Sequence, residues 1–300
     1  MKIRQCKKLH ILVTALLISS IIPVCLRCSG DHRMIHRRIN VMSFNVRYNN
    51  PADGGNAWPF RKEKVAETVR FHNLDIIGFQ EVFWNQIQDM EVLLPEYHWF
   101  GVGRDDGNRS GEFSPVFYRK DRIRVRKSST FWLSHVPDQP GIKGWDAACA
   151  RIVTWGYFED IDTGISFYLF NTHFDHIGEK AKKESARLIL KKVSEIAGES
   201  PVILTGDFNS TEKDSAYTLL TRDDGVRHCF TDTYWAPGVH RYGGTQTFTG
   251  FKEKIRPDLR IDYIFVRNVK QVVFSGIIYE RWNGTFVSDH NPVVTQIRIR

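Results

Sequence analysis

Ser288-Asp289-His290-Asn291-Pro292 ends a turn directly before an alternating segment, residues 293–299, that is typical of a strand. Earlier segments repeat this arrangement, each with a ligand-type or titratable residue at the end of an apolar run. They are Ser43-Phe44-Asn45, Phe79-Gln80-Glu81, Asn171-Thr172-His173, Gly206-Asp207-Phe208-Asn209 and Ile261-Asp262-Tyr263. Polar strand ends can converge at one rim of a sheet. Such a set of Asn, Glu, His and Asp side chains suits a hard divalent cation and acid–base chemistry on a phosphate ester.

Strands dominate the rest of the predicted structure. Apolar runs and alternation predict strands over residues 39–45, 74–79, 97–102, 115–118, 123–126, 152–158, 166–171, 201–205, 261–266, 272–278 and 293–299, and helical periodicity predicts helices over 61–71, 86–94 and 179–196. Many strands with few helices indicate α+β layers rather than an all-parallel doubly wound sheet.

The composition is that of an ordinary globular protein. The chain has 300 residues, of which 42% are hydrophobic and 25% charged, which is enough for a large core. No repeat, low-complexity tract or flexible linker follows residue 38. We therefore predict a single domain over residues 39–300.

The N-terminus has the pattern of an export signal. Residues 1–8 are basic without an acid, and residues 9–24 form an apolar core that is shorter than the ~20 residues of a membrane span. We predict a signal peptide over residues 1–28 and a basic connector over 29–38, and hence a periplasmic, cell-envelope or secreted protein. Lipid attachment at Cys25 or Cys28, an uncleaved anchor and a buried strand remain alternatives.

Export changes the charge and the cysteine count. Residues 1–28 hold five basic and no acidic residues, so their removal lowers the formal net charge from +8 to +3. This small charge disfavours strong electrostatic steering toward nucleic acid. Cys149 and Cys229 remain, and either a single bridge or two separate thiols would be consistent with this pair.

The polar strand ends have chemical roles that follow from residue type. We expect Asp207 to act as a base for an attacking water and Asn209 to donate its amide to a phosphate oxygen or to orient the nucleophile. Glu81 and Asn45 suit Mg²⁺, which takes few carboxylates and leaves positions for water and phosphate. Asp207 and Asn209 could also be plain turn residues.

The histidines allow two readings. Asp289 and His290 can divide roles, one binding metal and the other donating a proton, with Asp262 orienting the imidazole. A zinc site built from His173, His176 and His290 is the alternative, although it lacks the usual zinc-ligand spacing.

Arginines add two more features. Arg122, Arg124 and Arg126 alternate with apolar residues, and we interpret them as the solvated face of an edge strand rather than a phosphate-binding stripe. Arg151 opens a strand and could hold a phosphate oxygen. Residues 104–107 and 144–146 fall in loops, where specificity residues often lie.

Together the six motifs resemble, in order and spacing over residues 39–299, those of the endonuclease/exonuclease/phosphatase superfamily of deoxyribonucleases, apurinic endonucleases and neutral sphingomyelinases. Loops such as Gly103-Arg-Asp-Asp-Gly are similar to those of a secreted bacterial branch. The resemblance implies a four-layered sandwich, with two central, mostly antiparallel β-sheets flanked by helices. It also implies roles for the motif residues. Asn45, Glu81 and Asp289 would lie at the metal, His173 and Asn209 at the phosphate, Asp207 at the water, and Asp262 and His290 would form an Asp–His pair.

The leading hypothesis is a hydrolase that uses Mg²⁺ or Mn²⁺ and an activated water to cleave a phosphodiester or phosphomonoester. The substrate could be a nucleic acid, a phospholipid or a sugar phosphate, and we expect a monomer without a protein partner. The rivals are a non-catalytic binding protein on the same fold and a zinc-dependent hydrolase.

Overall fold

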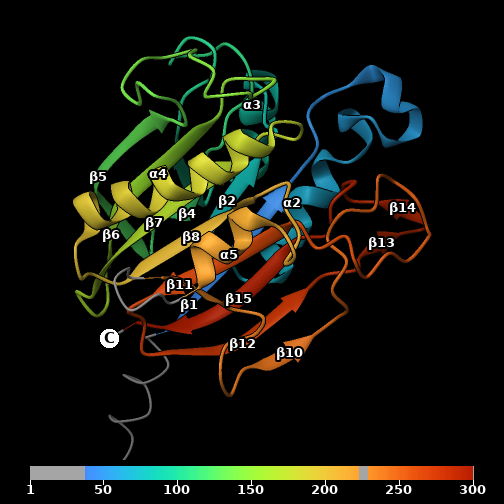
Figure 1. Cartoon of the computed structure of the whole chain (residues 1–300). Helices are drawn as coiled ribbons and strands as arrows, with labels where there is room; N and C mark the ends of the chain where they lie inside the picture. The colour runs from blue at the N-terminus through green and yellow to red at the C-terminus, as the bar shows by residue number, and fades with distance from the viewer. Residues whose placement is uncertain (1–37, 223–228, 300) are drawn as a thin grey trace, which may run out of the picture.

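Two β-sheets pack face to face in the computed structural model, which describes residues 38–222 and 229–299 (Figure 1). The predicted signal peptide, and the connector up to residue 37, lie outside the described residues. The first sheet has the order β10 (His240–Tyr242), β12 (Gln271–Ile277), β15 (Val293–Arg298), β1 (Arg38–Asn45), β2 (Ile76–Gln80), β4 (Val116–Arg119) and β3 (Tyr97–Phe100). The second has the order β5 (Ile123–Trp132), β6 (Ile152–Asp160), β7 (Ser166–His173), β8 (Val202–Asp207), β11 (Asp262–Arg267) and β9 (Thr231–Asp232).

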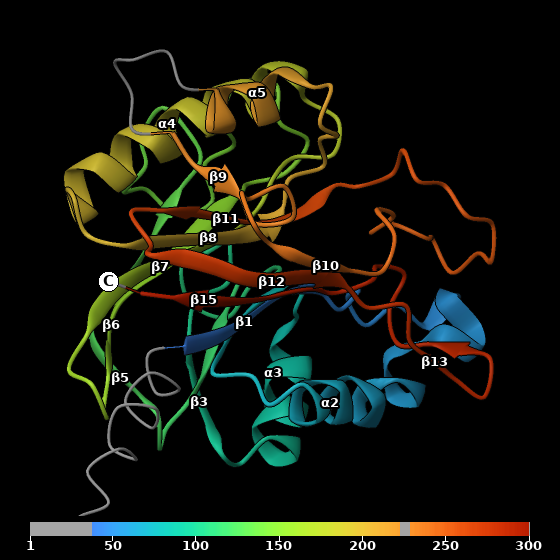
Figure 2. The ribbon, with the colours of Figure 1, turned by 90° about the horizontal axis from the view of Figure 1, so that it is seen from below.

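Helices cover the outer face of each sheet, which makes four layers (Figure 2). α2 (Lys62–Phe71) and α3 (Trp84–Leu93) lie on the first sheet, and α4 (Glu179–Ala197) and α5 (Ser215–Thr221) lie on the second. Short 3-10 helices η1 (Pro51–Asn56) and η2 (Trp58–Phe60) precede α2, and a hairpin of β13 (Arg281–Trp282) and β14 (Thr285–Phe286) follows β12. None of the helices in the described ranges is long and apolar enough to cross a bilayer.

The predicted fold class is confirmed. Among the described strands, β1–β2, β10–β12 and β7–β8 pair in parallel, and the other neighbours are antiparallel. The central strands β2, β8 and β11 are buried on both faces, which explains why their sequences are continuous apolar runs rather than alternating ones. Burial of each large apolar side chain contributes roughly 1.5–3 kcal/mol to stability.

The sheets approach most closely beneath the rim that carries the polar strand ends. A Cβ added to Gly78 of β2 would collide with the side chains of Thr205 and Asn171 from the second sheet. Asn171, fully buried, accepts from Gln80 Nε2 (2.7 Å) and Thr205 Oγ1 (3.0 Å). Its amide donates to the carbonyl oxygens of Phe79 (2.7 Å) and Pro115 (3.0 Å). These bonds hold the two sheets in one relative position under the site.

The prediction for the arginine stripe is wrong at one residue. Arg124 and Arg126 are exposed on the edge strand β5 and pair with Glu159, as expected of a solvated face. Arg122, by contrast, is 8% exposed and binds Asp160 Oδ2 at 2.8 Å, with Asp75 Oδ1 of the other sheet at 3.7 Å. It stands just before β5, and its side chain is held by these carboxylates instead of extending into solvent.

The shorter elements escaped prediction. The turn-rich residues 49–56 form η1, where the Asn50 side chain accepts from the Ala52 amide at 3.1 Å. Strand β5 continues to Trp132, beyond the predicted residue 126, because it pairs with β6 along its whole length. α5, β9, β10, β13 and β14 have two to seven residues each, too few for a periodic pattern.

Candidate active site

The polar strand ends converge at one rim, as the sequence predicts. Parallel pairing of β7 with β8 sets His173 opposite Asp207, and antiparallel pairing of β8 with β11 sets Asp262 opposite Asp207. Parallel pairing of β1 with β2 sets Asn45 opposite Gln80, one residue before Glu81. The two sheets therefore deliver their ligand-type side chains to a single place.

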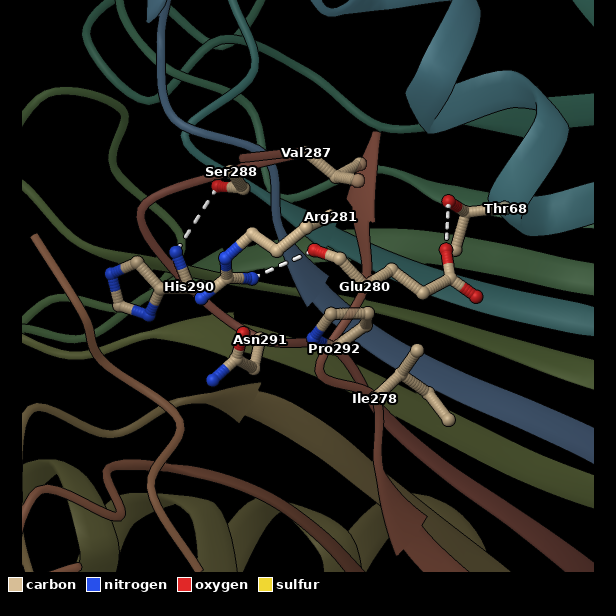
Figure 3. Close-up of a pocket in the computed structure, with 9 residues that line it drawn as sticks. All are labelled: Thr68, Ile278, Glu280, Arg281, Val287, Ser288, His290, Asn291 and Pro292. Atoms are coloured by element: carbon tan, nitrogen blue, oxygen red, sulfur yellow. Dashed lines mark hydrogen bonds between the residues drawn. The ribbon is translucent and has the colours of Figure 1, made fainter. Parts of the chain in front are cut away.

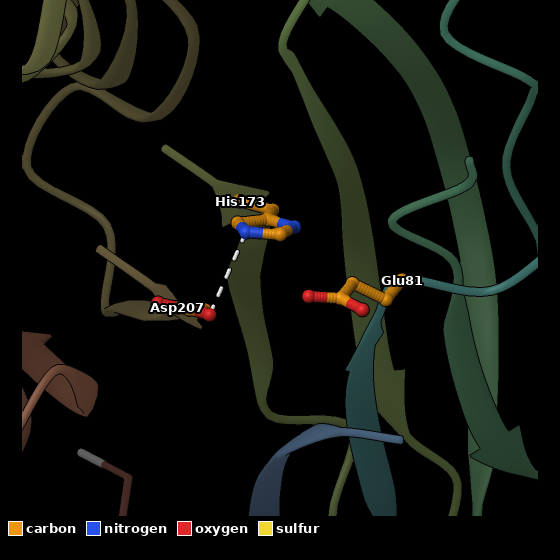
Figure 4. Close-up of side chains that lie close together, drawn as sticks. All are labelled: Glu81, His173 and Asp207. Carbon is orange, nitrogen blue, oxygen red and sulfur yellow. Dashed lines mark ion pairs between the residues drawn. The ribbon is translucent and has the colours of Figure 1, made fainter. Parts of the chain in front are cut away.

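Asp207 lies at the centre of this group and is 1% exposed. Asn45 Nδ2 donates to its Oδ2 (2.9 Å), and the backbone amide of Asn209 donates to its Oδ1 (2.9 Å). His173 Nε2 lies 3.5 Å from Oδ2, and His290 Nε2 lies 3.8 Å from the same atom. Figure 4 marks the His173–Asp207 pair with a dashed line. Burial and the charge of Asp262 raise the pKa of Asp207 to about 7, which suits a group that accepts a proton near neutral pH.

Asp262 and His290 form a buried pair. His290 Nδ1 lies 2.8 Å from Asp262 Oδ2, and the two residues are 5% and 1% exposed, respectively. Burial alone would lower the pKa of His290, but the charges of Asp262 and Asp207 outweigh it and raise this pKa well above its usual value. The Ser288 hydroxyl holds the turn by accepting from the His290 amide (3.3 Å, Figure 3) and donating to the Asn45 carbonyl (2.7 Å).

The residues predicted for the metal surround an arginine that sequence reasoning missed. Asn45 Nδ2 donates to Glu81 Oε1 at 3.0 Å. The Arg47 guanidinium lies 3.8 Å from Glu81 Oε2 and 3.9 Å from Asp289 Oδ2, while Asp53 binds it through two hydrogen bonds of 3.0 and 3.1 Å. Glu81 has a positive φ of 59°, a strained conformation for a non-glycine residue that is common at functional sites.

The donor set fits a divalent cation. Asp207, Asp262 and Asp289 are each at most 6% exposed, so their negative charges are withdrawn from water, and such burial is costly without compensating positive charge. Asp262 Oδ1 has no hydrogen-bond partner within the described residues. Carboxylate and amide oxygens are the ligands that Mg²⁺ and Mn²⁺ prefer.

The three-histidine zinc site is not assembled. Within residues 38–222 and 229–299, the groups with ligand atoms within 4.8 Å of one another are Glu81–His173–Asp207 and Asp207–Asp262–His290. His176 Nδ1 instead lies 3.0 Å from Arg151 Nη2. The zinc alternative therefore lacks its ligand set.

Asn209 is hydrogen-bonded to protein groups beside Asp207. Its Nδ2 donates to the carbonyl of Phe174 (3.0 Å) and lies 3.1 Å from His173 Nε2, so both amide hydrogens are engaged. Burial and the charge of Arg151 lower the pKa of His173 well below its usual value, so the ring is neutral near pH 7. With Nε2 accepting from Asn209, the ring hydrogen lies on Nδ1.

One pocket of about 690 Å³ contains most of the predicted residues. Asn45 and Asp262 lie behind its surface, bonded to the lining residues Asp207 and His290. The predicted residues that line it are Glu81, Arg151, His173, Asp207, Asn209, Asp289 and His290.

Sequence reasoning missed several residues of this site. Glu112 lines the pocket beside Arg151 and was not singled out, whereas Arg104, which also lines it, belongs to the loop 104–107 where specificity residues were expected. Arg61, fully buried, donates to the carbonyls of Val46 and Val287 (2.8 Å each) and so ties together the two segments that carry the metal residues. It gave no signal, because its partners are backbone atoms far apart in sequence.

The cysteines do not form a bridge. Cys149 and Cys229, both within the described residues, are not joined by a disulfide. Cys149 lines the pocket, and Cys229 Sγ donates to the carbonyl of Arg222 (2.6 Å).

The model of the endonuclease/exonuclease/phosphatase family matches residues 42–290, which include every strand end described above. The chain belongs to this family. It is similar to a solved endonuclease/exonuclease/phosphatase from Bacteroides vulgatus, at 43% identity and a TM-score of 0.83, covering 88% of this chain and 99% of that one. It is also similar to a mannosyl-6-phosphatase of Bacteroides thetaiotaomicron, at 38% identity and a TM-score of 0.80 over 86% and 99% of the two chains. Protein L388 of Acanthamoeba polyphaga mimivirus is 28% identical over 79% of this chain and 91% of its own length.

Family membership establishes the class of reaction. This endonuclease/exonuclease/phosphatase family protein is a divalent-metal-dependent phosphoesterase that hydrolyses phosphoric ester bonds with an activated water. The alternative of a non-catalytic binding protein is therefore set aside.

Proposed function

We propose that this protein is a Mg²⁺-dependent phosphomonoesterase that acts on a phosphorylated sugar. The observation that carries the proposal is the pocket of about 690 Å³, because it lies in the size range of small-molecule sites and holds the hydrolytic residues on its surface. A mannosyl-6-phosphatase that is 38% identical matches 86% of this chain over 99% of its own length, which supports the proposal.

The charges of the pocket favour a small substrate over a polyanion. Each of its three arginines has a carboxylate neighbour: Asp53 for Arg47 (3.0 Å), Glu112 for Arg104 (2.8 Å) and Asp175 for Arg151 (3.5 Å). Binding of a nucleic-acid backbone relies on cations that neutralise successive phosphates. Paired arginines offer little for that purpose, whereas one phosphate and a polar body can still bind here.

Asn45, Glu81 and Asp289 would hold the cation. Asn45 is hydrogen-bonded to Glu81, Glu81 and Asp289 lie 3.8 and 3.9 Å from the same Arg47 guanidinium, and all three side chains offer oxygen ligands. When bound, Mg²⁺ would polarise the phosphoryl group and offset the charge that develops on it. Mn²⁺ would suit the same ligands, so the choice of Mg²⁺ is part of the proposal.

The chain's own residues would carry the proton transfer and orient the substrate. Asp207 takes a proton from the water whose oxygen bonds to phosphorus, while the bond from phosphorus to the sugar oxygen breaks and that oxygen takes up a proton from solvent. Asp262 keeps His290 protonated, so His290 donates to the phosphoryl oxygens. Asn209 donates to His173 Nε2 and so holds this neutral ring in place beside Asp207.

Phosphate release from a substrate panel tests the proposal. We expect the highest kcat/KM for hexose phosphates such as mannose 6-phosphate, with lower values for phenyl phosphate, a bis(nitrophenyl) phosphodiester and single-stranded DNA. Asp207→Asn is the control for contaminating phosphatases, because loss of a positioned base typically lowers the rate ~10²–10⁴-fold. A phosphodiester as the best substrate would refute the proposal.

The place where the protein acts is a separate proposal. We infer export from the basic and apolar residues of segment 1–28. Mass spectrometry of the protein in its own cells should find a chain that starts near residue 29, outside the cytoplasm. A cytoplasmic chain with Met1 or Lys2 at its start would contradict export.

A further inference from the structure

His173 divides the pocket into two sides. Its Nε2 faces the hydrolytic side, 3.5 Å from Asp207 Oδ2 and 3.1 Å from Asn209 Nδ2. Its Nδ1 faces Glu112, whose Oε2 lies 3.7 Å away. Glu112, Arg104 and Arg151 all line the pocket on this second side, which the proposed reaction does not use.

The second side holds two buried donors without partners. Arg151 is 5% exposed and His173 7%, yet Arg151 Nη1 and His173 Nδ1 have no hydrogen-bond partner within the described residues. Glu112 Oε2 lies 3.9 Å from Arg151 Nη1 and 3.7 Å from His173 Nδ1, too far for a hydrogen bond. Buried N–H groups are seldom left unsatisfied, so these two point to an acceptor on a ligand.

Glu112 supplies the matching acceptor. Its side chain is 14% exposed, and its Oε2 accepts from Arg104 Nη1 at 2.8 Å. A carboxylate has about four acceptor positions, so one bond from Arg104 leaves Glu112 able to accept more. Arg104 fixes the carboxylate without using up its acceptor capacity.

The charge balance decides which kind of ligand group fits. Arg104 is paired with Glu112, and Arg151 is paired with Asp175, which is 1% exposed. Two cations and two anions leave no surplus of positive charge for a second phosphate. Hydroxyl groups, which both donate and accept, match a wall of buried donors beside a carboxylate acceptor.

We propose that Glu112 is a specificity-determining residue that accepts hydrogen bonds from hydroxyl groups of the sugar, while Arg151 Nη1 and His173 Nδ1 donate to oxygens of the same sugar. The inference rests on the proposed function, because it assumes that the phosphate binds on the Asp207 side of His173. The substrate then spans the imidazole, with its phosphate on one side and its hydroxyls on the other.

Glu112→Gln and monodeoxy substrates test this inference together. The isosteric amide removes the charge and half of the acceptor capacity, so kcat/KM for a hexose phosphate should fall roughly 10- to 100-fold more than kcat/KM for phenyl phosphate, which has no hydroxyls. In the wild type, at least one monodeoxy hexose phosphate should show a similar loss. For that analogue, Glu112→Gln should lower kcat/KM little further, because the hydrogen bond between the missing hydroxyl and Glu112 is already absent.

Glu67→Gln is the matched control, since Glu67 is an exposed acid on α2 that pairs with Arg70. It should change neither substrate's kcat/KM. Circular dichroism and thermal unfolding establish that Glu112→Gln is folded, and the wild-type measurements on monodeoxy substrates test the subsite even if it is not.

The outcomes separate the two proposals. If the wild type prefers phenyl phosphate or a phosphodiester to every hexose phosphate, the proposed function fails, and this inference fails with it. Two results would overturn only the sugar subsite, provided that the wild type prefers hexose phosphates. One is an equal fall of kcat/KM for both substrates in Glu112→Gln, and the other is a wild-type kcat/KM that no monodeoxy analogue lowers. In either case Glu112 serves to hold Arg104 and His173.

Discussion

Replacement of Asp262 by Asn probes the one contact on which the Asp–His pair depends. His290 Nδ1 lies 2.8 Å from Asp262 Oδ2, and both side chains are almost fully buried. The amide keeps the shape of the carboxylate but removes its charge. The imidazole of His290 would then lose the group that keeps it protonated and oriented next to Asp207.

The size of the effect follows from this geometry. A buried hydrogen bond to a charged group contributes ~1.5–3 kcal/mol, which corresponds to a loss of roughly 10- to 150-fold in kcat if the bond acts in the transition state. His290→Ala removes the imidazole itself and should lower kcat about 10²–10⁴-fold. Because Asp262 acts through His290, the double variant should be little slower than His290→Ala.

Steady-state phosphate release under saturating Mg²⁺ measures the four rates of this cycle. Asp258→Asn is the control, since Asp258 lies in the same segment but is exposed and paired with Arg256, and its rate should equal that of the wild type. Thermal unfolding excludes a general loss of structure. If the losses from Asp262→Asn and His290→Ala multiply in full, the two residues act independently and the pairing is wrong.

Three further results are expected. Excess chelator should abolish phosphate release and Mg²⁺ should restore it, because the cation proposed to bind Asn45, Glu81 and Asp289 polarises the phosphoryl group; full turnover in chelator would contradict the mechanism. Asn171→Leu should lower the unfolding free energy in urea by about 4 kcal/mol, at ~1 kcal/mol for each of its four hydrogen bonds; a loss below ~1 kcal/mol would show that the sheets do not depend on it. Arg122→Gln should lower the free energy of unfolding by ~3–5 kcal/mol, because it leaves the buried Asp75 and Asp160 without their cation. Arg124→Gln and Arg126→Gln should each change this free energy by less than ~0.5 kcal/mol, and equal effects of the three substitutions would refute the assignment.

Local pattern explains what could be predicted of the fold. Alternation predicts strands such as β1 and β15, and a 3.6-residue period predicts the helix α4. Both patterns depend only on residues that are neighbours in sequence. Short strands such as β9 and β10 are defined by the partner they pair with, so their own residues carry no such signal. The same holds for Arg122, which is buried beside Asp160 and Asp75, two residues far from it in sequence.

The sequence by itself determined which chemical groups stand at the strand ends. Asn45, Glu81, His173 and Asp207 follow apolar runs, and His290 lies in the turn before one. Since strand ends are set by local pattern, the meeting of these residues at one rim could be predicted. Their residue types pointed to a metal and a phosphate ester.

Only the tertiary structure decided how these groups are used. The contact of Asn209 with His173, the nitrogen of His173 that faces Glu112, and the carboxylate partners of the arginines all depend on distances between segments far apart in the chain. Those distances are set by the packing of one sheet on the other, which includes the Asn171 contacts with Phe79 and Pro115. No local sequence pattern encodes that packing, because each side chain involved takes its partner from a different strand or loop.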